Sequence, residues 1–415
     1  MKKFIIFSVM ALWFFTVAGQ AQELKGKSGN FKALIEKSYD VSSGGSLTIK
    51  RVVGDFTIKG WTKNVVQITQ DITIKSYTRG EAEEVYRRVL AGYSKTGNHV
   101  RIEGDYNGSR VRNNFVINVP EKFNVEVGTS GGDINLSGVD GELKMSTSGG
   151  DIDVVDAAGQ IKASTSGGDL TFTNVSGPIK ASTSGGDINL SDIFGEGTFS
   201  TSGGDIRLQN ATNKIRLNTS GGSIKVASVS ADLNANTSGG NIDVRDISGD
   251  CSVNTSGGDI DLFSIKGSLR ANTSGGDITG ENFEQDISVS TSGGDIKLGN
   301  VQGSVKGKTS GGDVTVNLTT TDFAAEHSVD LSTSGGTIKL TIPEKLPATI
   351  TAEIQTSRRN YERKRYDIYS DFPLTKTEPD KHGKVLIKSE GDINGGGDPI
   401  DLQTSGGDIY IKKAK

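Results

Sequence analysis

The sequence has one cysteine and three histidines among 415 residues. The single cysteine, Cys251, excludes a disulfide within the chain, and we interpret it as a small core residue. The histidines His99, His327 and His382 lie far apart, and none has another metal ligand at a characteristic spacing. The sequence also contains no nucleophile elbow and no phosphate-binding loop. These absences argue against an enzyme, and any enzymatic site would have to lie in the irregular segment 342–397.

An excess of positive charge is also lacking, because the formal net charge is -4. Nucleic-acid-binding proteins usually carry a basic field, so we do not expect a nucleic-acid partner. One short segment gathers basic residues, and these are candidate ligand-binding residues, with a solvated surface as the alternative. They are Arg358, Arg359, Arg363, Lys364 and Arg365.

Long apolar runs are absent after the first twenty residues. Residues 1–21 combine Lys2 and Lys3 with an apolar stretch and small residues near position 21, the pattern of a secretory signal. Its removal changes the formal charge from -4 to -6. A retained anchor is the alternative, but the apolar run is shorter than the roughly 20 residues that a bilayer span needs. We expect export to the periplasm, the outer membrane surface or the medium, and no transmembrane segment once the signal is removed.

A repeat dominates what is present. The tetrapeptide TSGG begins at Thr129 and returns every 18 residues as far as Thr309, then again at Thr333 and Thr404. Counted from the threonine, apolar residues occupy positions 6, 8, 15 and 17, and each pair alternates with polar residues, as in a strand with one buried face. Glycine is common at positions 4 and 13, where we expect it to supply positive φ. The nine-residue half-period predicts a flat parallel β-solenoid with two strands per coil. A three-sided coil is the alternative, because position 11 is also apolar.

Individual departures from the pattern are informative. Gly197 replaces a core aliphatic residue, and we expect Phe199, two residues later, to fill the lost volume.

The two ends of the repeat array differ from its middle, as solenoid caps must. Residues 45–58 already contain the half-repeat, and residues 78–95 have the apolar periodicity of one helix. Residues 400–411 repeat the motif once more at the other end. We therefore divide the chain into a signal (1–21), an N-terminal capping β region with one helix (22–128), regular solenoid repeats (129–341) and an irregular C-terminal solenoid and cap (342–415).

Three stretches, INVPEKFNVEVGTSGGDI (117–134), YSDFPL (369–374) and GDINGGGDPIDLQTSGGDIYI (391–411), carry a family resemblance. The chain resembles the bacterial "putative adhesin" family of β-strand repeat proteins of unknown function over nearly all of its mature length. The resemblance implies a secreted or envelope-associated β-solenoid and supplies no catalytic residues.

Stacked coils would place equal positions in rows. Position 5 carries an aspartate row that makes calcium a possible cofactor, with a purely structural row and no cofactor as the alternative; its members are Asp133, Asp151, Asp169, Asp187, Asp205, Asp259, Asp277, Asp295 and Asp313. Serine or asparagine at position 18, with lysine, arginine or serine frequent at position 16, forms a polar array that could meet glycans or simply satisfy turns.

These patterns together predict an all-β, exported, non-enzymatic solenoid that acts as an adhesin or a structural or binding module of the cell envelope. Its expected partners are a surface glycan or an envelope protein. The alternative is a glycan-binding or glycan-active protein whose site lies on the basic C-terminal segment.

Overall fold

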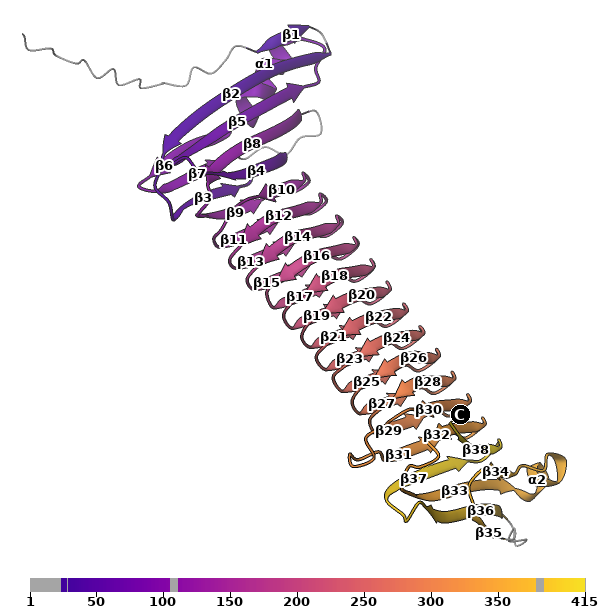
Figure 1. Cartoon of the computed structure of the whole chain (residues 1–415). Helices are drawn as coiled ribbons and strands as arrows, with labels where there is room; N and C mark the ends of the chain where they lie inside the picture. The colour runs from indigo at the N-terminus through magenta and orange to yellow at the C-terminus, as the bar shows by residue number, and fades with distance from the viewer. Residues whose placement is uncertain (1–23, 28, 105–110, 378–383, 415) are drawn as a thin grey trace, which may run out of the picture.

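The chain forms a long rod with one cap at each end (Figure 1). The computed structural model describes residues 24–27, 29–104, 111–377 and 384–414. The predicted signal at residues 1–21 lies outside these ranges. Within them, no helix is both long and apolar enough to cross a membrane.

Two parallel sheets run along the rod, and each 18-residue coil adds one strand to each of them. In the first, sheet A, Ile134 pairs with Ile152 and Ile152 with Leu170. In the second, sheet B, Leu143 pairs with Ile161 in the same way. Because successive coils keep this register, each position of a coil lies beside the same position of the next. The structure confirms the parallel β-solenoid with two strands per coil.

The solenoid strands of sheet A are β10 (Ile134–Ser137), β12 (Ile152–Ala158), β14 (Leu170–Ser176), β16 (Ile188–Phe194), β18 (Ile206–Ala211), β20 (Ile224–Val229), β22 (Ile242–Ile247), β24 (Ile260–Ile265), β26 (Ile278–Phe283), β28 (Ile296–Val301), β30 (Val314–Leu318) and β32 (Ile338–Ile342). Those of sheet B are β9 (Phe123–Gly128), β11 (Leu143–Ser146), β13 (Ile161–Ser164), β15 (Ile179–Ser182), β17 (Gly197–Ser200), β19 (Ile215–Asn218), β21 (Leu233–Asn236), β23 (Cys251–Asn254), β25 (Leu269–Asn272), β27 (Ile287–Ser290), β29 (Val305–Lys308) and β31 (Val329–Ser332).

Each sheet A strand from β12 to β28 bends at position 10, where the residue has positive φ. Asn174, for example, has a φ of 54°. This left-handed residue interrupts the alternation, so that position 11, here Val175, turns inward and is fully buried. Asparagine, aspartate and serine fill the position, and asparagine and aspartate tolerate this conformation better than most residues. The bend explains why position 11 is apolar although the coil has only two strands.

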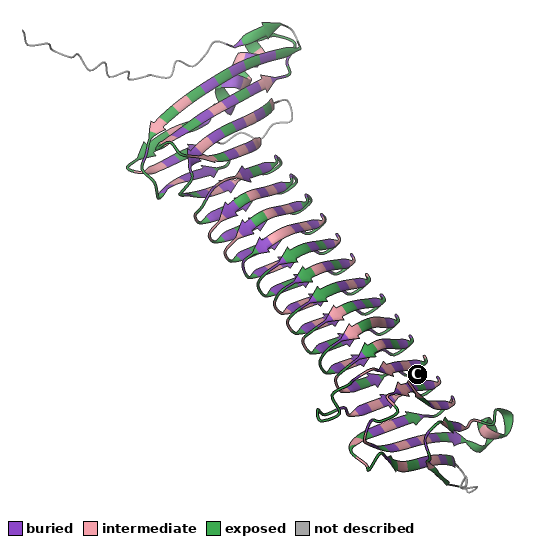
Figure 2. Ribbon diagram, viewed as in Figure 1, coloured by how far each residue is buried: buried purple, intermediate pink, exposed green. Residues whose placement is uncertain are grey.

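The inward positions 6, 8, 11, 15 and 17 form one continuous core along the rod, visible in Figure 2 as buried residues alternating with exposed ones. A Cβ on Gly197 would lie 2.3 Å from a ring atom of Phe199, which is fully buried. Phe199 therefore fills the space beside the glycine, as predicted. Cys251 is also in the core, where burial raises the pKa of its thiol to about 12.

The N-terminal cap inserts a coil out of chain order. Strands β3 (Gly45–Lys50) and β4 (Asp55–Trp61) stack directly on β9 and β10, which confirms the half-repeat predicted there. The other strands of the cap pair on the far side of that coil. In sheet B, β7 (His99–Glu103) pairs with β3, and β6 (Gly92–Thr96) is antiparallel to β7. In sheet A, β8 (Val111–Pro120) pairs with β4, and β5 (Val65–Ile74) is antiparallel to β8. Strands β2 (Asn30–Asp40) and β1 (Lys25–Lys27) follow β5 in sheet A.

One helix, α1 (Arg79–Val89), packs on the antiparallel part of this cap. Thr78 caps it by accepting a hydrogen bond from the backbone N–H of Glu81. Ala82 and Tyr86 lie in a small core with residues of β2 and β5. The predicted helix over 78–95 is therefore present, but it ends at Val89 because the chain turns into β6 shortly afterwards.

The C-terminal cap uses the same arrangement in reverse. The last strands, β37 (Asp398–Thr404) and β38 (Ile409–Lys413), stack on β31 and β32 and complete a regular coil. The intervening chain lies beyond them as β33 (Ala348–Ser357), α2 (Arg358–Arg363), β34 (Ile368–Ser370), β35 (Thr375–Thr377) and β36 (Lys384–Ile393), with β36 antiparallel to both β33 and β35. The short helix α2 was not predicted from the sequence.

The Gly197 and Phe199 pair makes a prediction for stability. Replacing Gly197 by isoleucine should lower the free energy of unfolding by about 1–3 kcal/mol, because the new side chain meets the ring. Replacing Phe199 by alanine alone should cost about 3–5 kcal/mol through the cavity left behind. The double variant recreates the pair Ile179 and Ala181 of the preceding coil and should lose less than the sum. Urea unfolding of the four proteins measures this, and simple additivity would contradict it.

The coil length makes a second prediction. Deleting residues 183–200 removes one whole coil and should leave a folded rod that is shorter by about 4.8 Å, the spacing of neighbouring strands. Deleting only six residues within a coil should disrupt the core, because inward and outward positions no longer match. Circular dichroism and small-angle X-ray scattering compare the two deletions, and equal behaviour would rule out the 18-residue unit.

Candidate functional site

The TSGG corner is a structural joint between coils. The hydroxyl of Thr219 donates a hydrogen bond of 2.9 Å to the carbonyl oxygen of Gly204 in the preceding coil. It also accepts one of 3.3 Å from the N–H of Gly222 in its own coil. The equivalent threonines from Thr147 to Thr404 donate the same bond at 2.8–2.9 Å, and all are buried. The motif therefore ties neighbouring coils together.

The glycine at position 4 is required by close backbone approach. A Cβ on Gly222 would lie 2.0 Å from the carbonyl oxygen of Gly204. None of the TSGG glycines has φ in the left-handed region, so the expected positive φ at this corner is wrong. At position 13, by contrast, Gly159 and Gly177 do have positive φ.

The aspartate row of position 5 also bonds coil to coil. One carboxylate oxygen of Asp133 accepts a hydrogen bond of 2.9 Å from the backbone N–H of Asp151, and the pattern continues to Asp313. Ser223 and Asn241, the two exceptions in the row, accept the same bond with their own side chains. The described residues contain no group of three or more acidic, histidine or cysteine side chains placed to hold a metal. Calcium binding to this row stays a prediction.

The basic C-terminal segment lies on and after α2, which projects from the C-terminal cap (Figure 1). All five basic side chains are exposed. Arg358 forms an ion pair of 3.0 Å with Glu362, and the neighbouring Tyr361 and Tyr366 pack against the core. The structure thus places these five residues together on the surface of the C-terminal cap, at the opposite end of the rod from the N-terminal cap.

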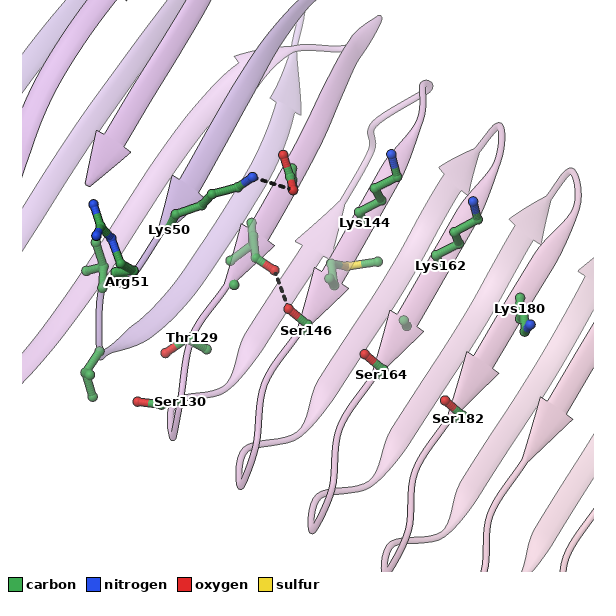
Figure 3. Close-up of a pocket in the computed structure, with 17 residues that line it drawn as sticks. Lys50, Arg51, Thr129, Ser130, Lys144, Ser146, Lys162, Ser164, Lys180 and Ser182 are labelled. Carbon is green, nitrogen blue, oxygen red and sulfur yellow. Dashed lines mark hydrogen bonds and ion pairs between the residues drawn. The ribbon is translucent and has the colours of Figure 1, made fainter. Parts of the chain in front are cut away.

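A groove of about 1030 Å³ lies on the outer face of sheet B beside the N-terminal cap (Figure 3). Position 16 contributes Lys144, Lys162 and Lys180 from three successive coils. Position 18 contributes a parallel row of exposed serines, Ser146, Ser164 and Ser182. Lys50 and Arg51 enter from the end of β3, so the groove is mainly basic.

The lysine row places like charges beside one another. Lys144 pairs in register with Lys162, and Lys162 with Lys180, an arrangement that is destabilising in a sheet. Lys144 has an acidic partner, because its ammonium lies 2.7 Å from Glu142, and their hydrogen bond raises the pKa of Lys144 and lowers that of Glu142. Within the described ranges, neither Lys162 nor Lys180 has an acidic group within ion-pair distance.

An ion pair within the protein lies at the end of the groove next to the N-terminal cap. The ammonium of Lys50 lies 2.9 Å from a carboxylate oxygen of Glu126. Figure 3 draws this ion pair as a dashed line from Lys50. In the position-18 row, Gly128 precedes Ser146, whose hydroxyl donates a hydrogen bond of 3.4 Å to the carbonyl oxygen of Val127. The sequence predicts the rows at positions 16 and 18, but it does not connect Lys50 with them. That connection depends on the insertion of the β3–β4 coil beside β9.

Farther along sheet B the same positions change character. Position 18 becomes asparagine in β19 to β25, and each side-chain amide bonds to the next at 2.9–3.1 Å. At position 16, Lys306 of β29 faces Asp330 of β31 at 3.3 Å. These rows satisfy or neutralise themselves, whereas the groove near the N-terminal cap does not.

The architecture and its corner define a capped parallel β-solenoid of the TSGG-repeat type. The chain belongs to the Toastrack DUF4097 family, whose model matches residues 24–279, 194–341 and 250–412. Nothing matches among the curated proteins.

Two solved structures are similar to this chain at low identity. One is described as a "putative adhesin" from Parabacteroides merdae, 14% identical, covering 68% of this chain and 95% of that one with a TM-score of 0.26. The other is a "putative cell adhesion protein" from Clostridium sporogenes, 11% identical, covering 91% and 99% with a TM-score of 0.14. Superpositions this loose carry no argument about function.

The corner network makes a prediction for stability. Replacing Thr219 by valine keeps the shape but leaves the carbonyl of Gly204 without its donor, which should cost about 1–3 kcal/mol of unfolding free energy. Thr219→Ser keeps the hydroxyl and should cost less. The exposed neighbour provides the control, because Ser220→Ala should change stability by about 0.5 kcal/mol or less. Urea unfolding measures all three, and equal losses for Thr219→Val and Ser220→Ala would contradict a structural role for the hydroxyl.

Proposed function

We propose that this chain is an exported, non-enzymatic β-solenoid that serves as an adhesin or a structural binding module of the cell envelope. The in-register stacking of coils is the observation that carries the proposal. Every outward position recurs in successive coils, so each face presents rows of side chains at the regular spacing of neighbouring strands. Such faces suit an extended, repeating partner such as a surface glycan or a regular envelope protein.

Two further observations support this role. Antiparallel strands extend both sheets at the N-terminal end and sheet B at the C-terminal end, which favours a discrete rod over end-to-end assembly. Residues 1–21 have the pattern of a secretory signal, in keeping with export.

A second candidate is a glycan site on the basic C-terminal segment. Its favouring observation is the exposure of five basic side chains on and after α2, next to two tyrosines. The helix has only six residues, and part of its charge is neutralised by the Arg358–Glu362 pair. The groove on sheet B is a defined concave surface of about 1030 Å³ that gathers in-register lysines from three coils, so we place the binding function there first.

Fractionation of the native cells tests the proposed function. An antibody to the chain should detect it in the periplasm, the outer membrane or the medium, at the size expected after removal of about 21 residues, because a cleaved signal implies export. A known cytoplasmic protein serves as the control for lysis. A full-length chain confined to the cytoplasmic fraction would contradict the proposal.

A further inference from the structure

We propose that the groove beside the N-terminal cap binds an extended acidic polysaccharide, a polymer of uronic acid residues, lying along the rod. Lys144, Lys162 and Lys180 would pair with successive carboxylates of the polymer. This inference rests on the proposed function, since it names the ligand of a binding face.

The charge arrangement points to an anionic ligand. Three ammonium groups lie in one in-register row. Glu142 interacts electrostatically with Lys162 as well as Lys144, but neither Lys162 nor Lys180 forms a direct ion pair within the described residues. Farther along sheet B, Lys306 lies in register between Ser288 and Asp330, and its ammonium pairs with Asp330 at 3.3 Å. A carboxylate supplied by a ligand would do for Lys162 and Lys180 what Asp330 does for Lys306.

The spacing points to a polymer with one negative charge per repeat. Neighbouring lysines are one strand spacing apart, about 4.8 Å, which is comparable to the length of one sugar residue in an extended chain. Lysine presents a compact charge with three donors that turn freely, so it tolerates the small mismatches of a flexible polymer.

The second row explains why a polysaccharide fits better than other polyanions. Ser164 and Ser182 offer exposed hydroxyls that can both donate and accept hydrogen bonds, as sugar hydroxyls require. The hydroxyl of Ser146 donates to the carbonyl of Val127 and can still accept. Proteins that bind single-stranded nucleic acids combine a basic groove with aromatic side chains on which the bases stack, and the lining of this groove has no aromatic residue.

Glu126 occupies the groove as an internal competitor. Its carboxylate lies 2.9 Å from the ammonium of Lys50. A ligand carboxylate that reached this end of the groove would compete with Glu126 for Lys50. Removing the negative charge of Glu126 should therefore strengthen binding.

Binding of polygalacturonate to the purified mature chain tests the inference, measured by titration calorimetry at low and high salt. Lys162→Ser/Lys180→Ser should weaken binding about tenfold, since each lost ion pair is exposed and modest in strength. Serine occurs naturally at position 16, as Ser252 and Ser288, so the fold should tolerate the change. Glu126→Gln should tighten binding about two- to threefold, and salt should weaken binding of all these proteins.

Matched controls separate this site from general charge. Lys297→Ser/Lys339→Ser removes the same charge from exposed positions on sheet A and should leave the affinity within about twofold. Arg359→Ser/Arg363→Ser does the same on α2 while keeping the tyrosine anchors, and it too should have little effect. Melting curves by circular dichroism confirm that each variant is folded.

Several outcomes would overturn the inference. These are equal affinity of the Lys162/Lys180 variant and the parent, a tenfold loss in the α2 variant instead, and equal binding of neutral dextran. Tighter lysine-dependent binding of poly(dT) or of phosphatidylglycerol vesicles would assign the groove to another polyanion. Fractionation is independent of these results: an exported chain that ignores polygalacturonate refutes only the ligand, and a cytoplasmic chain that binds it refutes only the proposed function.

Discussion

The close contact between position-4 glycines of successive coils sets the geometry of the rod. With only about 2.0 Å between a hypothetical Cβ on Gly222 and the carbonyl of Gly204, no side chain fits between the two corners. The buried hydroxyl of Thr219 then satisfies polar groups of both coils at once, which matters because an unpaired buried carbonyl is costly. Since the same joint recurs in each regular coil, the coils stack in register and their core positions coincide.

This joint also explains which features could be predicted from the sequence. The 18-residue period, the inward positions and the compensation between Gly197 and Phe199 are local regularities, so the sequence alone predicts them correctly. The left-handed bend at Asn174 and its equivalents was missed, although the odd step between apolar positions 8 and 11 carried the signal. The helix α2 was missed because it is held by packing of Tyr361 and Tyr366 on the C-terminal cap. The complete lining of the groove could not be predicted from the sequence either, since Lys50 reaches the groove only because the β3–β4 coil is inserted beside β9.

Both caps cover strand edges that the parallel stack would otherwise leave unpaired. At the N-terminal end antiparallel strands extend both sheets, as β5 does beside β8. At the C-terminal end β36 extends sheet B beside β33, whereas sheet A ends in the short parallel strand β34. In both caps a coil from the terminal part of the chain lies between the regular repeats and the strands that close the sheet. The long faces of the two sheets, rather than the ends, are therefore the surfaces available for binding. The groove lies on such a face, where the inserted coil meets the first regular coils.

In-register stacking requires each outward row of polar or charged side chains to be satisfied or neutralised, because the same position of neighbouring coils lies side by side. Aspartate at position 5 meets this requirement by accepting a backbone N–H from the next coil. Asparagine at position 18 meets it through amide-to-amide bonds such as that from Asn254 to Asn236. Lysine has three donors and no acceptor, so a lysine row cannot satisfy itself. The row from Lys144 to Lys180 is retained beside exposed serines and without full neutralisation. An external anion would neutralise such a face, whereas the aspartate and asparagine rows satisfy themselves.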